Sequence, residues 1–276
     1  MGWLRGINIK SSRELTIMRE AGKINARALL AAVQTARPGA TTAQVNAAAA
    51  DVIHSFNAEP AFLGYPGPYP YPAETTISVN EELVHGIPGP RVLVEGDIVS
   101  IDCGTVFEGF VADSALTVAI GEVSEEAQTL MEVTLGSLYA GIQEMVAGNK
   151  TGDVSAGIQN FVEKNGYQVV REYTGHGVGA NMHEDPQVPN YGTAGRGVVL
   201  RKGMTIALEP MVLLEDPGTR VLEDQWTVAS RNGRITAHYE HTVAVTENGP
   251  RVLTALEEDL DLGEAIRYNQ YFAGRG

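Results

Sequence analysis

The order of helix-like and strand-like segments repeats once along the chain, and this repeat limits the folds that the chain can adopt. Two helical stretches followed by strands occupy residues 12–120, and the same order recurs in residues 124–250. Three residues near the start of the second helix match between the two halves at one constant offset. Gly39, Thr42 and Val45 correspond to Gly148, Thr151 and Val154. Runs of helices followed by strands favour an α+β fold with antiparallel pairing. Two such halves, packed sheet beside sheet, would leave a cleft on their pseudo-twofold axis.

Local signals set the bounds of the predicted elements. Ser11 and Glu14 form a capping-box pattern before a helix that ends ahead of Pro38. Ser124 is the expected N-cap of the first helix in the second half. Helices are predicted at residues 12–36, 42–56, 125–146 and 153–164, and strands at 74–80, 96–102, 110–120, 167–173, 204–209 and 234–245. Residues 60–73, which are dense in proline, tyrosine and glycine, predict a shaped loop.

The composition narrows the class of protein. With 276 residues and a hydrophobic content of 43%, we expect one catalytic domain spanning residues 1–276, in which 256–276 form a tail without an assigned role. The net charge of −14 argues against a nucleic-acid partner. The single cysteine, Cys103, excludes an internal disulfide and fits a reducing compartment. Without a membrane-spanning apolar run or a signal-peptide profile, the chain is expected to be a cytoplasmic enzyme with no membrane partner.

Four acidic residues and one histidine lie in or beside apolar, strand-like segments. They are Asp102, Asp113, His176, Glu209 and Glu240. A carboxylate in such a segment is costly unless a positive charge compensates it, and none of the four has an Arg or Lys nearby in sequence. Taken singly, each acid could be a helix cap, a turn residue or half of an ion pair. Taken together, they predict a site for divalent cations.

The types of ligand in this set indicate which metal ions could bind and which chemistry they would support. Oxygen-rich ligation with one imidazole nitrogen suits Mn, Fe(II), Co or Zn better than a structural zinc site, which prefers Cys and His. Four carboxylates are enough to hold two ions, and a pair of divalent ions is typical of hydrolases. The identity of the metal stays open.

The strand pattern predicts which of these side chains share a face. Asp102 and Asp113 lie on consecutive predicted strands joined by a short turn from Gly104 to Gly109, so they can face each other across a hairpin. By the same alternation, Ser100 shares the face of Asp102, and His238 and Thr242 share the face of Glu240. Cys103 then points away from Asp102 and is expected to be a buried structural thiol.

Five segments carry a resemblance to a known family: SVNEELVHGIPG, GDIVSIDCG, GHGVGANMHEDPQVPNYG, ALEPMV and HYEHTVAVT. In this order and spacing, from about residue 8 to 255, the chain resembles the methionine aminopeptidases of the pita-bread fold. The short distance between His183 and Glu209 leaves no room for the helical insertion of the type II enzymes, so the chain is similar to type I.

The resemblance implies a role for each matching residue. Asp102 would chelate one metal, Asp113 and Glu240 would bridge both, and His176 and Glu209 would complete the second. Glu209 would also move a proton to the departing amine. By the same resemblance, His183 would stabilise the carbonyl oxygen as it gains charge. His85 would contact the leaving nitrogen or the amide of the second residue.

The methionine pocket is where the chain departs from its relatives. Tyr65 and Trp226 match the aromatic walls of a pocket suited to a thioether. Phe62 and Thr76 stand where cysteines are common, and Met182 replaces a frequent aromatic residue. His238 stands where glutamine is usual, Ala207 replaces a hydroxyl residue, and the segment PGPYPYPAE at 66–74 is about three residues longer than in the bacterial members of the family. These differences bear on side-chain preference and metal affinity.

The resulting expectation is an enzyme that removes the initiator methionine from peptides and nascent proteins when the second residue is small. One alternative is a related pita-bread aminopeptidase with another or broader specificity, such as a proline-directed one. A second is a non-enzymatic pita-bread binding protein, which should have lost metal ligands. A monomer is expected, and a transient contact with the ribosome stays open.

Overall fold

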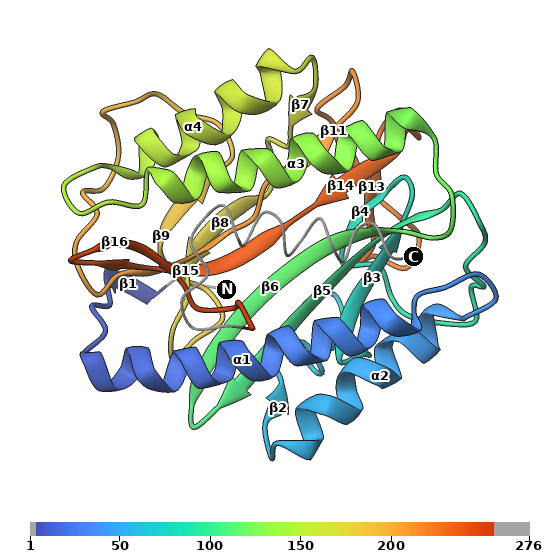
Figure 1. Cartoon of the computed structure of the whole chain (residues 1–276), viewed down its shortest axis with the longest axis horizontal. Helices are drawn as coiled ribbons and strands as arrows, with labels where there is room; N and C mark the ends of the chain where they lie inside the picture. Colours follow the sequence, from blue (N-terminus) through green and yellow to red (C-terminus); the bar gives the residue numbers. More distant parts are fainter. Residues whose placement is uncertain (1–3, 257–276) are drawn as a thin grey trace.

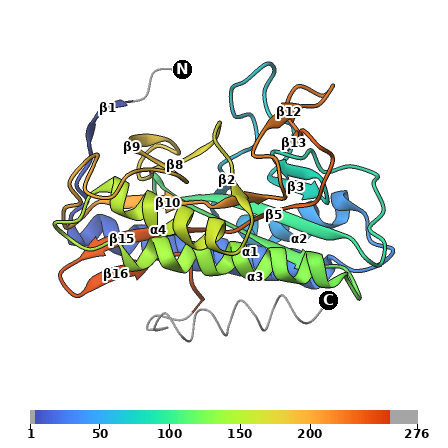
Figure 2. The same ribbon diagram turned by 90° about the horizontal axis from the view of Figure 1, so that it is seen from above.

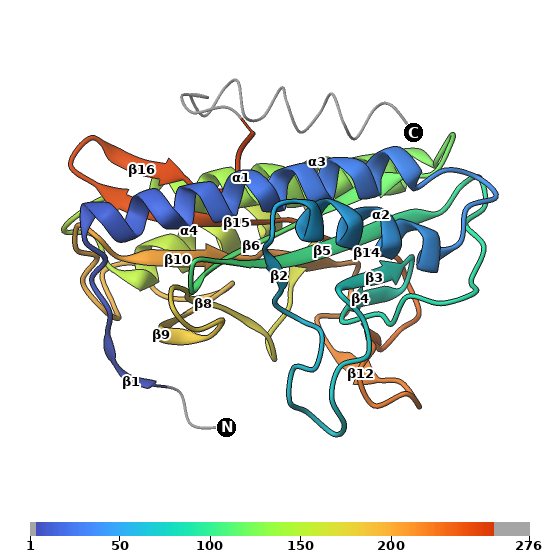
Figure 3. The same ribbon diagram turned by 90° about the horizontal axis from the view of Figure 1, so that it is seen from below.

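Four helices cover one face of a large sheet in the part of the chain that the computed structural model describes, residues 4–256 (Figure 1, Figure 3). The first half contributes α1 (Ser12–Thr35) and α2 (Thr42–Ser55), and the second contributes α3 (Glu125–Gln143) and α4 (Thr151–Lys164). The predicted capping box at Ser11 and Glu14 and the predicted N-cap at Ser124 are confirmed. The predicted tail spans residues 256–276, and all of it except residue 256 lies outside the described residues.

The main sheet joins the two halves of the chain. Its path runs through β1 (Leu4–Ile7), β9 (Glu184–Pro189), β8 (Thr174–Gly177), β10 (Thr205–Leu208), β15 (Glu240–Thr246), β6 (Phe110–Ala119), β5 (Ile98–Phe107) and β2 (Glu59–Pro60). Two further strands pair at the side of this path, β16 (Gly249–Val252) with β15 and β3 (Thr75–Val79) with β5. The pairs are antiparallel except for β1 with β9, so the α+β prediction with antiparallel sheets flanked by helices is confirmed.

Two smaller sheets accompany the main one. One contains β14 (Thr236–His238), β11 (Met211–Leu213) and β7 (Gln168–Val169), and the other contains β12 (Thr219–Val221), β13 (Val228–Ser230) and β4 (Glu82–Val84). β12 and β13 lie on the side of the main sheet opposite the helices (Figure 2). Helices therefore close one face of the molecule, while short strands and loops build the other.

Several predicted strands are divided or shortened. The segment 234–245 forms two strands that break at Tyr239, because β14 pairs with β11 in a small sheet whereas β15 continues the main sheet. The prediction at 167–173 was too long, since only Gln168–Val169 pairs with β11. The predicted turn from Gly104 to Gly109 was also wrong. The ladder between β5 and β6 continues to the pair Phe107 and Phe110, leaving only Glu108 and Gly109 in the turn.

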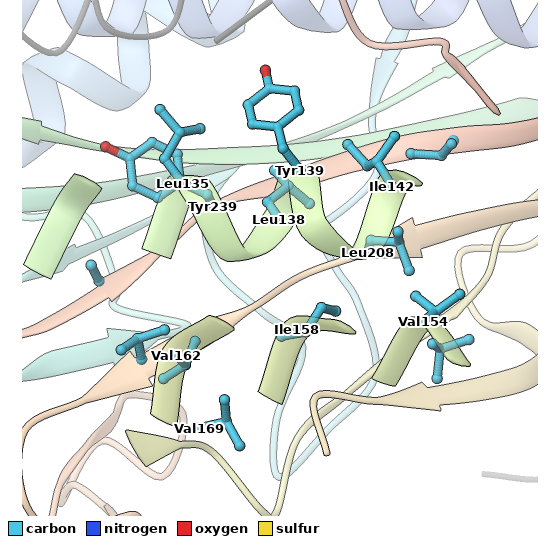
Figure 4. Packing of buried hydrophobic residues seen from close by; sticks show 14 of the residues in the cluster. Leu135, Leu138, Tyr139, Ile142, Val154, Ile158, Val162, Val169, Leu208 and Tyr239 are labelled. Atoms are coloured by element: carbon cyan, nitrogen blue, oxygen red, sulfur yellow. The ribbon is translucent and has the colours of Figure 1, made fainter. Parts of the chain in front are cut away.

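Buried apolar side chains fix the helices on the sheet. In the second half, Leu138 and Ile142 of α3 and Ile158 of α4 pack toward Leu208 of β10 (Figure 4). A second cluster sits beneath α1 and α2 and includes Ile53, Ile101 and Cys103. Burying one such aliphatic side chain contributes roughly 1.5–3 kcal/mol, so the helices hold the strands firmly enough to place side chains on their opposite face. The predicted burial of Cys103 is confirmed.

Candidate metal centre and pocket

The hairpin of β5 and β6 presents two aspartates on one face. Asp102 pairs with Ala115, and Asp113 pairs with Gly104, so the two carboxylates are diagonal neighbours on the same side of the ladder. Glu108 and Gly109 both have positive φ, at 46° and 79°, as the tightest hairpin turns require. The turn therefore fixes the register that brings Asp102 and Asp113 together.

The second half brings a histidine and two glutamates to the same place. Glu240 begins β15 and pairs with Ala115, the residue that also pairs with Asp102. His176 on β8 pairs with Ala207 of β10, and Glu209 directly follows β10. The main sheet therefore collects the carboxylates and the imidazole from strands that are far apart in the sequence.

The distances within this cluster suit a metal site. One ligand atom from each of Asp113, His176 and Glu240 lies within 4.8 Å of the others. The Nε2 atom of His176 is 3.9 Å from Asp113 Oδ2 and 3.4 Å from Glu209 Oε1. Its Nδ1 is 2.9 Å from the carbonyl oxygen of Gly177, which can only accept a hydrogen bond. Nδ1 is thus the protonated nitrogen, and Nε2 presents its lone pair to the carboxylates, as in a metal-ligating histidine.

Burial and mutual repulsion set the protonation of the group. Burial, with repulsion from neighbouring carboxylates, raises the pKa of Asp102, Glu209 and Glu240 well above their ordinary values. Burial also raises the pKa of Asp113 to about 7. For His176, burial lowers the pKa to about 3, so its ring is neutral. Such a cluster resists holding its full negative charge by itself.

The donor atoms fit a divalent cation. Within residues 4–256, Oδ1 of Asp102, Oδ1 of Asp113 and Oε1 of Glu240 are buried without a hydrogen-bond partner. Among the same described residues, the ion-pair contacts of these acids are to histidines, and no Lys or Arg neutralises them. Oxygen atoms left without protons or hydrogen bonds need a cation, and this set, with one nitrogen, suits Mn, Fe(II), Co or Zn.

All of the predicted site residues line one cavity of about 140 Å³. The metal-ligand candidates form one part of its wall: Asp102, Asp113, His176, Glu209 and Glu240. The remainder consists of the other predicted site residues and one that sequence reasoning missed: Phe62, Tyr65, Thr76, His85, Met182, His183, Trp226 and the additional Tyr71. The cavity is therefore charged at one end and apolar or aromatic elsewhere.

Two histidines of the cavity, His85 and His183, contact its aromatic residues. The ring of His183 is 4.3 Å from that of His176, and its Nδ1 is 2.6 Å from the hydroxyl of Tyr65. His85 packs edge-on against Trp226, with ring centroids 6.4 Å apart. It adopts a positive φ of 61°, which is uncommon for a residue with a side chain and costs conformational energy. Burial lowers the pKa of both histidines, to about 4 for His85, so both are neutral.

His238 is not among the residues that line the cavity. Its Nε2 is 3.8 Å from Oε2 of Glu240, which confirms that the two side chains share a face. Neither ring nitrogen has a hydrogen-bond partner within the described residues. Burial lowers the pKa of His238 to about 3, so this ring is neutral beside the carboxylate.

Tyr71 is the cavity residue that sequence reasoning missed. Its hydroxyl donates to the carbonyl oxygen of Gly86 at 2.8 Å, next to His85, and the residue is 2% exposed. The signal available was the repeated Tyr-Pro pattern of the loop, in which Tyr69 and Tyr71 look alike. Only the fold separates them, because Tyr69 is 38% exposed and does not line the cavity.

Comparison with known proteins agrees with this geometry. Residues 16–247 match metallopeptidase family M24. The methionine aminopeptidase of Clostridium acetobutylicum is 49% identical, over 91% of this chain and 100% of its own length. Methionine aminopeptidase 1 of Bacillus subtilis is 46% identical, over 89% of this chain and 98% of its own.

Solved structures extend the comparison to the fold. The crystal structure of methionine aminopeptidase from Thermotoga maritima has a TM-score of 0.88 and 46% identity, covering 90% of this chain and 99% of that one. The prolidase from Pyrococcus furiosus has a TM-score of 0.72 and 25% identity, covering 90% of this chain and 66% of the prolidase. These neighbours confirm the predicted pita-bread fold. A match over most of its length, at this level of identity, places the chain in metallopeptidase family M24.

Proposed function

We propose that the protein is a type I methionine aminopeptidase, which hydrolyses the first peptide bond of chains that begin with methionine and a small second residue. The observation that carries this proposal is the single cavity in which four carboxylates and three histidines meet an apolar, aromatic slot. The relatives named methionine aminopeptidase, which align over almost their whole length, support it.

The proposed metal centre uses the five predicted ligands. Asp102 would hold one ion, Asp113 and Glu240 would hold both, and His176 and Glu209 would complete the second. Two divalent ions bound there would supply Lewis-acid polarisation of the scissile carbonyl and lower the pKa of water. The buried, unpartnered oxygens of Asp102, Asp113 and Glu240 support this assignment.

Glu209 is the proposed proton carrier. It is partly exposed, with 14% of its side chain accessible, whereas the side chain of Glu240 is 3% exposed. Burial and the neighbouring aspartates raise its pKa, so the carboxylate binds a proton readily. A group with these properties can accept the proton of attacking water and deliver it to the departing amine.

His183 is the proposed hydrogen-bond donor to the carbonyl oxygen. Burial raises the pKa of the Tyr65 phenol, so its hydroxyl stays protonated and can donate to Nδ1 of the neutral His183 ring. In that tautomer Nε2 carries the hydrogen. A donor that is fixed before the reaction stabilises developing negative charge effectively.

The apolar part of the cavity is proposed to hold the methionine side chain, and His85 the amide that follows. Phe62, Tyr65, Met182 and Trp226 offer polarisable surface suited to a thioether. Gly67 lies against the indole of Trp226, which keeps the loop 64–73 close to this wall. Crowding of this kind supports a small second residue.

The expected substrates are the N-termini of peptides and nascent proteins. No helix within residues 4–256 is long and apolar enough to cross a membrane. Action in the cytoplasm, a monomeric state and a transient ribosome contact remain parts of the proposal. The similarity to a prolidase keeps a proline-directed specificity as the second candidate.

One experiment tests the proposal. Metal-free protein is supplied with Mn, Co, Fe(II) or Zn, and kcat/KM is measured for peptides that begin with Met, Leu, Pro or Lys and share one tail. We expect hydrolysis only after metal is added, and fastest with Met. Lys should be rejected because its charge would be buried unpaired. The Asp113→Asn protein, which lacks a shared ligand, is the inactive control.

The outcomes separate the parts of the proposal. Full hydrolysis by rigorously metal-free protein would overturn the metal mechanism. A clear preference for the Leu- or Pro-led peptide would overturn the methionine specificity and leave the metallo-aminopeptidase assignment standing.

A further inference from the structure

Asn25 occupies an unusual position for an amide side chain. It lies in the middle of α1 and is fully buried, with an exposed fraction of 0%. Asparagine is less favourable than alanine in a helix interior, and burying an amide costs free energy unless its polar atoms are hydrogen-bonded. Such a residue needs specific partners.

The partners of Asn25 belong to both strands of the β5–β6 hairpin. Its Nδ2 donates to the carbonyl oxygen of Cys103 and, at 3.3 Å, to that of Ala112. A longer contact of 3.4 Å reaches Oγ1 of Thr105. The hydroxyl of Ser114 donates to its Oδ1. One side chain from α1 therefore binds β5 and β6 at the same time.

These partners flank Asp113 in the ladder, on the face of the hairpin that α1 covers. Cys103 pairs with Ser114 and Thr105 pairs with Ala112, and the pair of Gly104 with Asp113 lies between them. Because successive side chains alternate across a strand, Cys103 and Ser114 face α1, while Asp102 and Asp113 face the metal centre. The Asn25 amide thus spans the ladder directly beneath the two carboxylates.

We infer that Asn25 is a positioning residue for metal binding, which fixes the register of β5 against β6 and so the spacing between Asp102 and Asp113. Its bonds to the Cys103 carbonyl, the Thr105 hydroxyl and the Ser114 hydroxyl are made together when Cys103 lies opposite Ser114, and the two hydroxyls make this contact specific to the register. A slip by two residues would keep every side chain on its face but would shift one carboxylate by roughly 6–7 Å along the strand. That shift would break up the cluster with Glu240. The inference rests on the proposed metal site and adds a residue to its support.

The test is calorimetric titration of metal-free protein with Mn²⁺, which needs no catalysis. Asn25→Leu replaces the amide by an apolar side chain of similar size, and Ser114→Ala removes a single one of its hydrogen bonds. We expect Asn25→Leu to weaken Mn²⁺ binding by about 10- to 100-fold, as is typical when a residue that orients metal ligands is lost. Ser114→Ala should weaken Mn²⁺ binding by a smaller factor. If Asn25→Leu does not fold, the Ser114→Ala variant still tests the inference.

Arg19→Met is the matched control. Arg19 lies on the same helix, is 3% exposed, and donates to the carbonyl oxygens of Leu253 and Ala255 at 2.8 and 2.5 Å. Its loss should lower the melting temperature as the loss of Asn25 does, but should change Mn²⁺ affinity by less than about twofold because its hydrogen bonds to Leu253 and Ala255 lie outside the hairpin.

The results distinguish the inference from the function on which it rests. Wild-type protein that binds no Mn²⁺ would overturn the proposed metal site. Wild-type binding that persists unchanged in both Asn25→Leu and Ser114→Ala would overturn only the role of Asn25. Equal weakening in Asn25→Leu and Arg19→Met would reduce Asn25 to a general stabilising residue, which also contradicts the inference.

Discussion

At the level of single residues, the centre depends on groups whose protonation is set by their surroundings. The Gly177 carbonyl selects one tautomer of His176, and the proposed donation from the Tyr65 hydroxyl would select one of His183. The two ring centroids are 4.3 Å apart, and under this proposal the rings would present different atoms to the cavity, a lone pair in one case and an N–H in the other. Neighbouring histidines can therefore act as a metal ligand and as a hydrogen-bond donor.

Glu209→Gln should reduce kcat by about 10²–10⁴-fold, the usual contribution of a positioned acid–base group. The substitution keeps the side-chain volume and removes the charge and the proton acceptor. Steady-state kinetics on a Met-led peptide measures the effect, and an unchanged melting temperature in the metal-loaded protein shows that the fold is intact. Activity within a few-fold of wild type would contradict the proton-carrier role.

His183→Ala should lower kcat by about 10²–10³-fold with little change in KM, because the hydrogen bond strengthens only as charge develops on the carbonyl oxygen. Tyr65→Phe keeps the aromatic wall and removes the hydroxyl that orients the ring, so a smaller fall in kcat is expected. A raised KM with nearly constant kcat in His183→Ala would make this residue a binding group instead.

At the level of elements, the sequence predicted helices better than strands. Capping residues such as Ser11 and Ser124 indicate from local sequence where a helix begins, and both predictions are confirmed. Strands such as β14 and β15 are one apolar run in the sequence and separate only because their partners belong to different sheets. Pairing partners are distant in sequence, so composition does not reveal them.

The residues of the candidate site also differ in how far the sequence alone reveals them. Acids such as Asp113 could be singled out because they interrupt apolar strands, where the cost of burial makes them conspicuous. Tyr71 could not, since a tyrosine in a proline-rich loop is ordinary and its contact with Gly86 depends on the fold. Asn25 was missed for a similar reason, because its partners lie on strands far along the chain.

The β5–β6 turn offers a test at this scale. Glu108 holds a φ of 46°, a left-handed conformation that costs a residue with a Cβ about 1–2 kcal/mol, whereas asparagine tolerates it better. Glu108→Asn should therefore raise the free energy of unfolding by roughly 0.5–1 kcal/mol, measured by urea denaturation. Glu108→Gln, which retains the strain, should stay near wild type. A gain of equal size in both variants would point to charge and not to backbone conformation.

At the level of the whole molecule, the proposed metal centre draws its ligands from both halves of the chain. Asp102 and Asp113 come from the first half, and His176, Glu209 and Glu240 from the second. We infer that residues 4–256 act as one catalytic domain, since neither half holds the complete ligand set. The division into two similar halves at 12–120 and 124–250 stays a prediction.

Bound metal should change how the stability of the folded protein depends on pH. In metal-free protein the folded Asp113 has a pKa of about 7, above its unfolded value near 3.9, so the folded state binds more protons in between. The stabilisation of the folded state by protonated Asp113 is lost as the pH rises through 7. The melting temperature of metal-free protein should fall between about pH 6.5 and 8. Below that window the buried histidines, whose pKa values are lowered, act in the opposite direction.

Thermal melts with and without Mn²⁺ measure this effect. Added Mn²⁺ should raise the melting temperature more at pH 8 than at pH 6.5, because the ion binds the deprotonated carboxylates. Asp113→Asn provides the control and should show a weaker pH dependence in the metal-free state. A metal-free melting temperature that rises from pH 6.5 to 8 would contradict the assignment of these buried acids.

The position of Trp226 gives the molecule an optical property of its own. The chain contains two tryptophans, and this one lines the cavity, with Tyr71 5.2 Å and His85 6.4 Å from its ring. Its emission should respond to whatever displaces water beside the indole, so occupancy could be followed by intrinsic fluorescence without a label. Trp226→Phe would remove that signal and keep an aromatic wall. The residue that shapes the slot would thus also report when the slot is filled.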